Sequence, residues 1–247
     1  MEIGRWLRQF ADGALTVLIA PVCAACERPL EAPTRGAVCE PCWASIVPLT
    51  PPFCNACGDA LPSWRTLSLE LAMCPRCRRG PRLIALARAV GPYEGGLRAI
   101  VQAMKYDSRP TIARPLAARM REAGADILRD ADLVVPVPLH PARERRRGFN
   151  QARELARHIG MPWHDALRRT RRTPPQADLP APRRHANVRG AFACSAPQAV
   201  ADRVVVIVDD VSTTGATLNA CAAPLLAAGA RDVRALTAAR AMTRRPR

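Results

Sequence analysis

Eight of the ten cysteines lie between residues 23 and 77, and all eight occur as Cys-x-x-Cys pairs. The pairs are Cys23/Cys26, Cys39/Cys42, Cys54/Cys57 and Cys74/Cys77. Two thiolates three residues apart can bind one metal ion from a tight turn, and two such pairs complete a tetrahedral four-thiolate site. The spacing therefore predicts two structural Zn²⁺ ions. We expect the first two pairs to form one site and the last two the other, although the spacing also permits interleaved pairing.

Two other chemistries can use cysteine pairs, and both are less favoured here. A disulfide framework is typical of secreted proteins, but the first 25 residues make a poor signal peptide because Asp12 interrupts them. A redox role for one pair is weaker still, because four pairs together indicate a structural function. The remaining cysteines, Cys194 and Cys221, are isolated. We expect neither to bind metal or ligand, and Cys221 to be a small buried hydrophobic residue.

The segment 204–217 combines an aliphatic strand with two carboxylates and a loop of small hydroxyl residues. Asp209 and Asp210 follow the aliphatic run, and the loop Ser212–Thr217 leads into a helix. Backbone N–H groups of such a loop, at the positive end of a helix, bind an anion such as phosphate. The carboxylates suit neighbouring sugar hydroxyls or Mg²⁺. The pattern therefore favours a phosphorylated ribose, and the alternative is an ordinary strand–turn–helix with a capping hydroxyl.

Hydrophobic periodicity indicates the elements that position these residues. After residue 82, apolar runs alternate with amphipathic segments, which predicts an α/β domain with a mainly parallel sheet flanked by helices. The expected strands span 83–90, 133–139, 204–208 and 233–238, and the expected helices span 94–106, 147–159 and 216–228. Pro224 lies inside the last helix and is expected to kink or break it.

The chain divides into three expected parts. Residues 1–20 form an amphipathic N-terminal lead, residues 21–82 the cysteine module, and residues 83–247 the α/β domain. The cysteine module has little periodicity, so bound metal must supply its stability. We expect the lead to pack on this module, with contact to a membrane surface as the alternative. The sequence contains no run of eighteen apolar residues, so no transmembrane helix is predicted. We therefore expect a cytoplasmic protein, and association with a membrane through the lead stays open.

The charge of the chain is strongly positive and unevenly distributed. It carries 37 basic and 21 acidic residues, a formal net charge of +16. Residues 83–247 hold 28 basic and 14 acidic residues, and Lys105 is the single lysine. This asymmetry indicates an anionic partner of the α/β domain, either phosphates or nucleic acid. Aromatic residues make up only 4%, which leaves few platforms for stacking single-stranded bases.

Segment 204–217 resembles the phosphoribosyl-pyrophosphate (PRPP) motif of type I phosphoribosyltransferases. Further segments resemble, in order and spacing, the ComF family, which includes competence proteins of DNA uptake. They are Met104–Tyr106, 134–141, 147–152, 173–176 and 187–192. The four cysteine pairs resemble the double zinc ribbon at the front of that family. The resemblance covers residues 20–241 and implies a type I phosphoribosyltransferase-like domain of the α/β class, preceded by a small cysteine-rich zinc ribbon module.

The resemblance also implies roles for individual residues. Asp209 and Asp210 would contact the ribose hydroxyls and be the catalytic pair if the site turns over PRPP. The implied PRPP-binding set is Asp209, Asp210, Ser212, Thr213, Thr214, Gly215, Ala216 and Thr217, with Pro138, Leu139, His140 and Arg147. The implied cofactors are two structural Zn²⁺ ions and Mg²⁺ with PRPP. Segment 168–189 matches a mobile loop that closes over the active site, and a solvated basic loop is the equal alternative.

The arginines suggest where nucleic acid would bind. The expected contacts are Arg143, Arg145, Arg146, Arg168, Arg169, Arg171 and Arg172. The favoured function is a PRPP-binding protein that handles single-stranded DNA during natural transformation, with the DNA-uptake machinery as a partner. A metabolic phosphoribosyltransferase that transfers the pentosyl group to an unidentified acceptor is the alternative, and a PRPP-sensing regulator is the third hypothesis. No group of residues indicates the acceptor.

Overall fold

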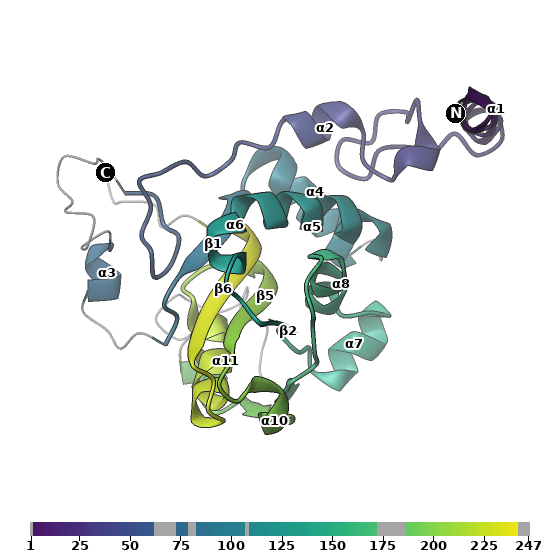
Figure 1. Cartoon of the computed structure of the whole chain (residues 1–247). Coiled ribbons are helices and arrows are strands. Elements are labelled where there is room, and N and C mark those ends of the chain that lie inside the picture. Colours follow the sequence, from purple (N-terminus) through teal and green to yellow (C-terminus); the bar gives the residue numbers. More distant parts are fainter. Residues whose placement is uncertain (1, 62–72, 79–82, 107–108, 172–185, 242–247) are drawn as a thin grey trace.

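The computed structural model describes residues 2–61, 73–78, 83–106, 109–171 and 186–241. At its centre is a four-stranded sheet with the strand order β1-β6-β5-β2, and each neighbouring pair is parallel (Figure 1). The strands are β1 (Ala87–Pro92), β2 (Leu133–Pro136), β5 (Val204–Ser212) and β6 (Asp232–Arg240). A separate antiparallel pair joins β3 (Leu167–Arg169) to β4 (Phe192–Cys194). The expected α/β class with a mainly parallel sheet is confirmed.

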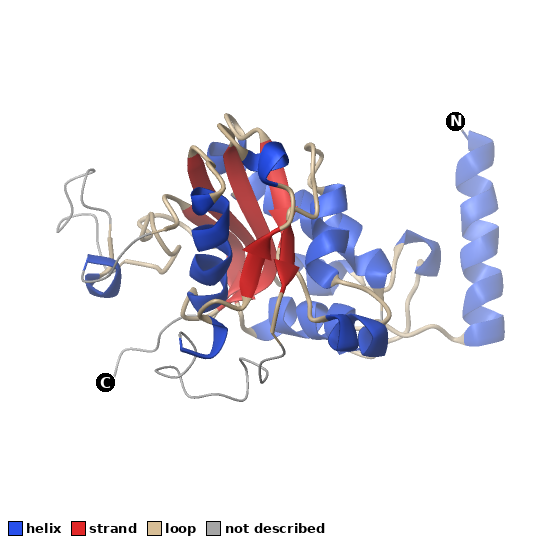
Figure 2. Ribbon diagram, turned by 90° about the horizontal axis from the view of Figure 1, so that it is seen from below, coloured by secondary structure: helices blue, strands red, loops and turns tan. Residues whose placement is uncertain are grey.

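Helices cover both faces of the sheet (Figure 2). In the α/β domain they are α4 (Gly95–Tyr106), α5 (Ala113–Ala123), α6 (Ala125–Leu128), α7 (Pro141–Arg147), α8 (Gln151–His158), α10 (Pro197–Val200) and α11 (Ala216–Ala227). The short 3-10 turn Pro110–Ile112 precedes α5. Helices α4, α5 and α8 share one hydrophobic core with one face of β5, and α11 shares a second core with the other face.

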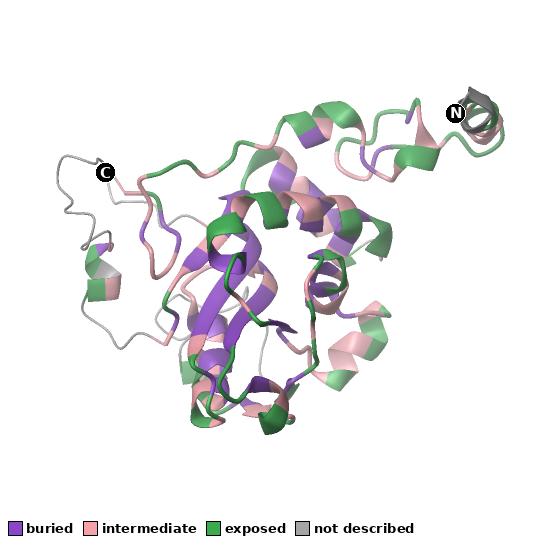
Figure 3. Cartoon of the chain, in the orientation of Figure 1, coloured by how far each residue is buried: buried purple, intermediate pink, exposed green. Residues whose placement is uncertain are grey.

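The buried residues concentrate in the sheet and on the helix faces against it (Figure 3). Successive side chains of a strand point to opposite faces. Val206 and Val208 therefore enter the first core, while Val205 and Ile207 enter the second. All four are 0% exposed. A strand covered on both faces has to be apolar at every position, which explains the unbroken aliphatic run.

Strand β5 is longer than expected, and this changes the position of the two carboxylates. The sequence predicts that the strand ends at Val208, with Asp209 and Asp210 after it. Instead, β5 continues to Ser212 because β6 stays paired with it up to Arg240. The carboxylates therefore lie within the parallel ladder. Strand β1 spans Ala87–Pro92 and is thus displaced from the expected 83–90. Strand β2 ends at Pro136, before the expected 139, because Pro136 and Pro138 lack the N–H that a ladder needs.

The expected helix over 147–159 begins later, at Gln151, and Arg147 is instead the last residue of the preceding helix α7. Gly148 ends α7 with a φ of 85°, a left-handed conformation that glycine adopts without strain. The side chain of Asn150 then caps α8 by accepting a hydrogen bond from the Ala152 N–H at 3.0 Å. Pro224, by contrast, does not break α11, which runs unbroken from Ala216 to Ala227. Packing of its buried face on the sheet outweighs the one backbone hydrogen bond that proline cannot make.

The cysteine module contains two copies of the same turn. In the first, the Cys23 N–H donates to the Arg28 carbonyl at 2.8 Å, and in the second the Cys54 N–H donates to the Asp59 carbonyl at 2.7 Å. An isolated β-bridge closes each turn, and the fifth residue of each has a positive φ, 62° in one copy and 73° in the other. Such turns aim both thiols of a Cys-x-x-Cys pair at one point.

The eight thiols gather into two groups of four. One group is Cys23, Cys26, Cys39 and Cys42, and the other is Cys54, Cys57, Cys74 and Cys77. Within each group the sulfur atoms all lie within 4.8 Å of one another, close enough to ligate one ion tetrahedrally. Sequential pairing is therefore confirmed. The short helices α2 (Glu40–Ala44) and α3 (Pro75–Arg78) each carry one cysteine of these groups.

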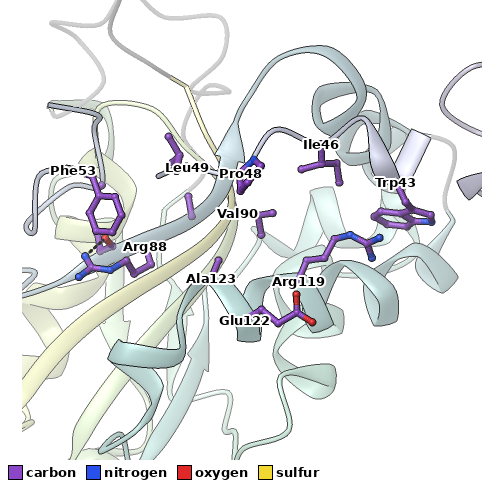
Figure 4. A pocket seen from close by; sticks show the side chains of 13 residues that line it. Trp43, Ile46, Pro48, Leu49, Phe53, Arg88, Val90, Arg119, Glu122 and Ala123 are labelled. Carbon is purple, nitrogen blue, oxygen red and sulfur yellow. Dashed lines mark hydrogen bonds between the residues drawn. The ribbon is translucent and has the colours of Figure 1, made fainter. Parts of the chain in front are cut away.

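The segment between the two cysteine groups runs along the edge strand β1 (Figure 4). The Leu49 N–H donates to the Val90 carbonyl at 3.0 Å, and the Ala87 N–H donates to the Asn55 carbonyl at 2.7 Å. These bonds cover backbone groups that an open sheet edge would leave unpaired. A cavity of about 250 Å³ remains between this segment, β1 and α5. At its two ends Arg88 lies over the Phe53 ring, 4.5 Å from the centroid, and Arg119 lies over the Trp43 ring at 4.3 Å.

Helix α1 (Glu2–Ile19) extends away from the α/β domain (Figures 1 and 2). It contacts the cysteine module at the 3-10 turn Pro33–Arg35, where the Thr34 N–H donates to Asp12 Oδ1 at 2.8 Å. Several of its apolar side chains are exposed, including Trp6 at 65% and Phe10 at 68%. Among the described helices, none combines the length and the apolarity that crossing a membrane requires.

We expect purified protein to contain two Zn²⁺ ions per chain. The double variant Cys26→Ser/Cys39→Ser should lose the first ion and Cys57→Ser/Cys77→Ser the second, because each removes two ligands of one site. Elemental analysis measures both stoichiometries. The control variant Cys194→Ser should keep two ions, since Cys194 lies in β4, apart from both groups. Protein without zinc and with oxidised thiols would contradict the assignment.

Candidate functional site

A cavity of about 260 Å³ lies where β2 and β5 end, at the edge of the sheet where parallel α/β folds bind their ligands. Segments that follow three strands line it, namely Tyr93 after β1, residues 137–139 after β2 and residues 209–218 at the end of β5. Side chains at the end of α4 and from α7, α8 and β3 complete the wall. All residues of the predicted phosphate loop, Ser212–Thr217, are among the lining residues.

The two carboxylates lie side by side in β5 but face opposite cores. Asp210 is buried, and its Oδ1 lies 2.9 Å from the ammonium of Lys105. Its Oδ2 is buried and has no hydrogen-bond partner among the described residues. A buried carboxylate oxygen without a partner is costly, which indicates a site for a hydroxyl donor or a hydrated cation. The unpartnered Asp210 oxygen therefore suits a sugar hydroxyl, from which it can accept a hydrogen bond, or Mg²⁺, which it can ligate.

Asp209 has a different environment. Its Oδ1 accepts a hydrogen bond from the Asp210 N–H at 2.8 Å. Burial, followed by repulsion from the Asp210 carboxylate, raises the pKa of Asp209 to about 7, although the charges of Lys105 and Arg169 act in the opposite direction. Asp209 therefore titrates near neutral pH. A carboxyl group poised in this way in a cavity is typical of functional sites.

Lys105 is a site residue that sequence reasoning did not include in the predicted set. It lies in the last turn of α4, whose apolar face is buried against the sheet. Desolvation acts to lower the pKa of Lys105, but the facing Asp210 carboxylate outweighs it, so the pKa is raised from its ordinary value. Lysine is therefore charged in the cavity. Two signals could have found it: it is the single lysine of the chain, and it lies in the matched segment Met104–Tyr106.

The phosphate loop connects β5 to the N-terminus of α11. Gly215 occupies the N-cap position with a φ of 77°, a left-handed conformation that favours glycine. The Ala216 N–H donates to Thr214 Oγ1 at 3.3 Å, and Ser212 Oγ accepts a hydrogen bond from Arg240 at 2.7 Å. The loop is thus held from both sides at the positive end of a twelve-residue helix, where backbone N–H groups favour an anion.

The predicted residues after β2 divide into those that line the cavity and those that do not. Pro138, Leu139 and Arg147 line it. The Arg147 guanidinium donates to Gln151 Oε1 at 2.7 Å and lies over the Tyr106 ring, 5.6 Å from its centroid. His140 is not a lining residue, because its Nδ1 caps α7 by accepting the Ala142 N–H at 3.2 Å.

The arginines predicted to bind nucleic acid also separate into two groups. Arg143 and Arg169 line the cavity, whereas Arg145, Arg146, Arg168 and Arg171 are exposed outside it. Arg169 lies over the Phe192 ring at 5.2 Å, and its pKa is lowered by desolvation and then by the charge of Arg143. Arg172 lies outside the described residues.

The start and the end of segment 168–189 differ from the expected loop. Arg168 and Arg169 belong to β3 and pair with Ala193 and Phe192 of β4. The hairpin was missed because two strands of three residues each are too short to show an alternation of apolar and polar residues. Arg171 Nη2 donates to the Arg189 carbonyl at 2.7 Å and joins the two arms. The greater part of the predicted loop, residues 172–185, lies outside the described residues.

Comparison with known proteins identifies both halves of the chain. A model described as a phosphoribosyl transferase domain matches residues 116–247, and one described as a double zinc ribbon domain matches residues 14–78. The two four-cysteine groups are therefore sites for structural zinc. A solved structure titled as the allosteric regulatory enzyme of purine biosynthesis overlaps 56% of this chain and 30% of its own, with 22% identity and a TM-score of 0.37.

Similar proteins cover most of the chain. The DNA utilization protein YhgH of Escherichia coli O157:H7 is 32% identical over 78% of this chain and 93% of its own length. Competence protein F of Haemophilus influenzae is 29% identical and covers 84% of this chain and 92% of its own. Competence protein ComFC of Bacillus subtilis is 26% identical, with coverages of 78% and 79%. The two domain matches, together with relatives that are covered almost completely, show that the chain belongs to the ComF family.

Proposed function

We propose that the chain binds PRPP, or a closely related phosphoribose ligand, at the end of β5 and handles single-stranded DNA during natural transformation. One observation carries the ligand assignment: a pair of adjacent carboxylates, buried Asp210 and half-buried Asp209, lines the same cavity as a phosphate loop at a helix N-terminus. A phosphate next to a sugar diol needs both groups at once, because hydroxyls donate to carboxylates and phosphate accepts from backbone N–H groups.

Each part of PRPP has a counterpart in the cavity. The loop Ser212–Thr217 suits the 5-phosphate, and Asp209 and Asp210 suit the ribose hydroxyls, one of which would satisfy the unpartnered Asp210 Oδ2. The Pro138–Leu139 segment and Arg147 suit the pyrophosphate. The Mg²⁺ that accompanies PRPP would supply neutralising charge at the pyrophosphate. If the bond between ribose and pyrophosphate breaks, the carboxylates lie where they can stabilise positive charge on the ribose.

The DNA-handling part of the proposal rests on charge and on the relatives. Relatives that span nearly their whole length on this chain are named for DNA utilization and competence. Four exposed arginines lie outside the cavity but near elements that line it: Arg145 and Arg146 in α7, Arg168 in β3, and Arg171 two residues after β3. Positive charge in this arrangement attracts a phosphate backbone without reading bases.

Removing both carboxylates should abolish PRPP binding. A lost charge-assisted hydrogen bond costs roughly 1.5–3 kcal/mol, so we expect each substitution to weaken affinity about tenfold or more. Isothermal titration calorimetry with Mg²⁺ and PRPP would measure Asp209→Asn alone and Asp209→Asn/Asp210→Asn. The single variant matters because it keeps the Lys105–Asp210 ion pair intact.

A matched control removes the same charge elsewhere. Glu31→Gln/Asp202→Asn neutralises two exposed acids far from the cavity and should leave the affinity within about twofold. Circular dichroism would establish that every variant is folded. Unchanged PRPP affinity in a folded double-carboxylate variant counts decisively against the site.

PRPP affinity should rise with pH and level off above pH 7. The pKa of Asp209 in the folded chain is about 7, above its ordinary 3.8, so below pH 7 the group is mostly protonated and accepts hydroxyls poorly. Affinity should then fall by up to about tenfold per pH unit. Asp209→Asn, which retains only the titration of the ligand, should show a smaller change. Equal pH profiles for the two proteins would contradict this role.

The same titration has the opposite effect on stability. Between about pH 4 and pH 7 the folded chain holds a proton on Asp209 that the unfolded chain has lost, so the free energy of unfolding should decrease as pH rises through this window. Urea unfolding of the wild type and of Asp209→Asn at several pH values measures the difference. The variant should gain stability relative to the wild type as pH rises, and a constant difference would refute the shifted pKa.

Binding of single-stranded DNA should depend steeply on salt. Changing Arg145, Arg146, Arg168 and Arg171 to Gln should lower the slope of log affinity against log salt by up to about 3, because each lost phosphate contact contributes about 0.7. Fluorescence titration of a labelled oligonucleotide measures the slope. The control changes four exposed arginines away from the cavity, Arg28, Arg35, Arg129 and Arg203, to Gln. An equal loss in both variants, or no DNA affinity in the wild type, would favour the metabolic alternative.

A further inference from the structure

Arg240 connects the second zinc site to the phosphate loop. It is the last residue of β6 and is 1% exposed. Its Nε donates to Asp59 Oδ1 at 2.7 Å, and its Nη1 donates to Ser212 Oγ at 2.7 Å. Asp59 belongs to the turn that carries Cys54 and Cys57, while Ser212 begins the phosphate loop. One buried side chain therefore contacts both structures.

The guanidinium also lies within electrostatic reach of the zinc ligands. Burial acts to lower the pKa of Arg240, but Asp59 and then the thiols of Cys57 and Cys77 outweigh it, so the pKa is raised. Its Nη2 is buried and has no hydrogen-bond partner among the described residues. Four thiolates around one Zn²⁺ carry a net negative charge that a neighbouring cation compensates. The orientation of Arg240 should thus depend on the loaded site.

The backbone reinforces this connection. Ser212 and Arg240 are partners at the end of the β5–β6 ladder, and the Ala241 N–H donates to the Ser212 carbonyl at 2.8 Å. The Arg240 carbonyl accepts a hydrogen bond from the N–H of Tyr93, a cavity-lining residue, at 2.8 Å. A shift of Arg240 would therefore move the start of the loop and one wall of the cavity together.

The first zinc site provides an internal comparison. Its turn has the same backbone hydrogen bonds, but the position equivalent to Asp59 holds Arg28, which is exposed. Among the described residues, no hydrogen bond or ion pair joins this first turn to the phosphate loop. The chain thus has two similar zinc turns. Among the described residues, hydrogen bonds through Arg240 join the second turn to the phosphate loop, and none joins the first.

We propose that Arg240 is a positioning residue through which zinc at the second four-cysteine site sets the geometry of the phosphate loop and hence the affinity for a phosphorylated ribose. The ligand part of this inference rests on the proposed function. Coupling between two sites in one protein is typically 5–150-fold in affinity. Because coupling in binding free energy is reciprocal, a bound ligand should raise the zinc affinity of the second site and leave that of the first unaffected.

The test compares loss of each zinc ion. In Cys57→Ser/Cys77→Ser we expect about tenfold weaker PRPP binding and about tenfold faster amide exchange in residues 209–218, measured by hydrogen–deuterium exchange without ligand. In Cys26→Ser/Cys39→Ser both should stay within about twofold. Equal effects from both variants would show only general destabilisation and overturn the proposal, as would unchanged exchange in the first variant.

Two further variants break the connection and keep all eight cysteines. Asp59→Asn should loosen the loop and weaken PRPP binding with zinc still at two per chain, and Arg28→Gln at the equivalent position of the first turn is its control. Loop exchange in Ser212→Ala should be the same with and without the added substitutions Cys57→Ser/Cys77→Ser. If the wild type does not bind PRPP, the proposed function fails, whereas the exchange data still decide whether Arg240 couples the two structures.

Discussion

The parallel ladder between β5 and β6 is the constraint on which the rest of the structure depends. It continues beyond the buried part of the sheet to the pair formed by Ser212 and Arg240. Because neighbouring residues on a strand face opposite sides, this extension directs Asp209 and Asp210 into different surroundings. A strand that ended at Val208 would leave both carboxylates in a solvated loop, without the buried partner of one and the raised pKa of the other.

Local patterns predicted the parts of the fold that depend on local physics. Eight cysteines at a three-residue spacing indicated two zinc sites, and the aliphatic run Val204–Val208 indicated a strand buried on both faces. The zinc pairing and the α/β class are confirmed, while the ligand roles of the site residues stay predictions. Helix boundaries were harder, because the break at Gly148 depends on a left-handed conformation that hydrophobic periodicity does not register.

The contacts missed by sequence reasoning join residues far apart in the chain. Arg240 and Asp59 are separated by 181 positions, so no window of the sequence contains both. Lys105 meets Asp210 only because α4 packs against the face of the sheet to which Asp210 points. In both cases the missing information was topology, since the strand order β1-β6-β5-β2 brings β6 beside β5 and places α4 over them.

The choice of lysine at position 105 follows from the same geometry. The chain uses arginine at 36 of its 37 basic positions, yet the cation that forms an ion pair with Asp210 is the single lysine. The arginine fork matches a carboxylate through two parallel N–H donors and would occupy both oxygens of Asp210. The compact ammonium of Lys105 pairs with Oδ1 and leaves Oδ2 without a protein partner among the described residues. Lysine thus pairs with Asp210 and still leaves it one acceptor oxygen for a ligand.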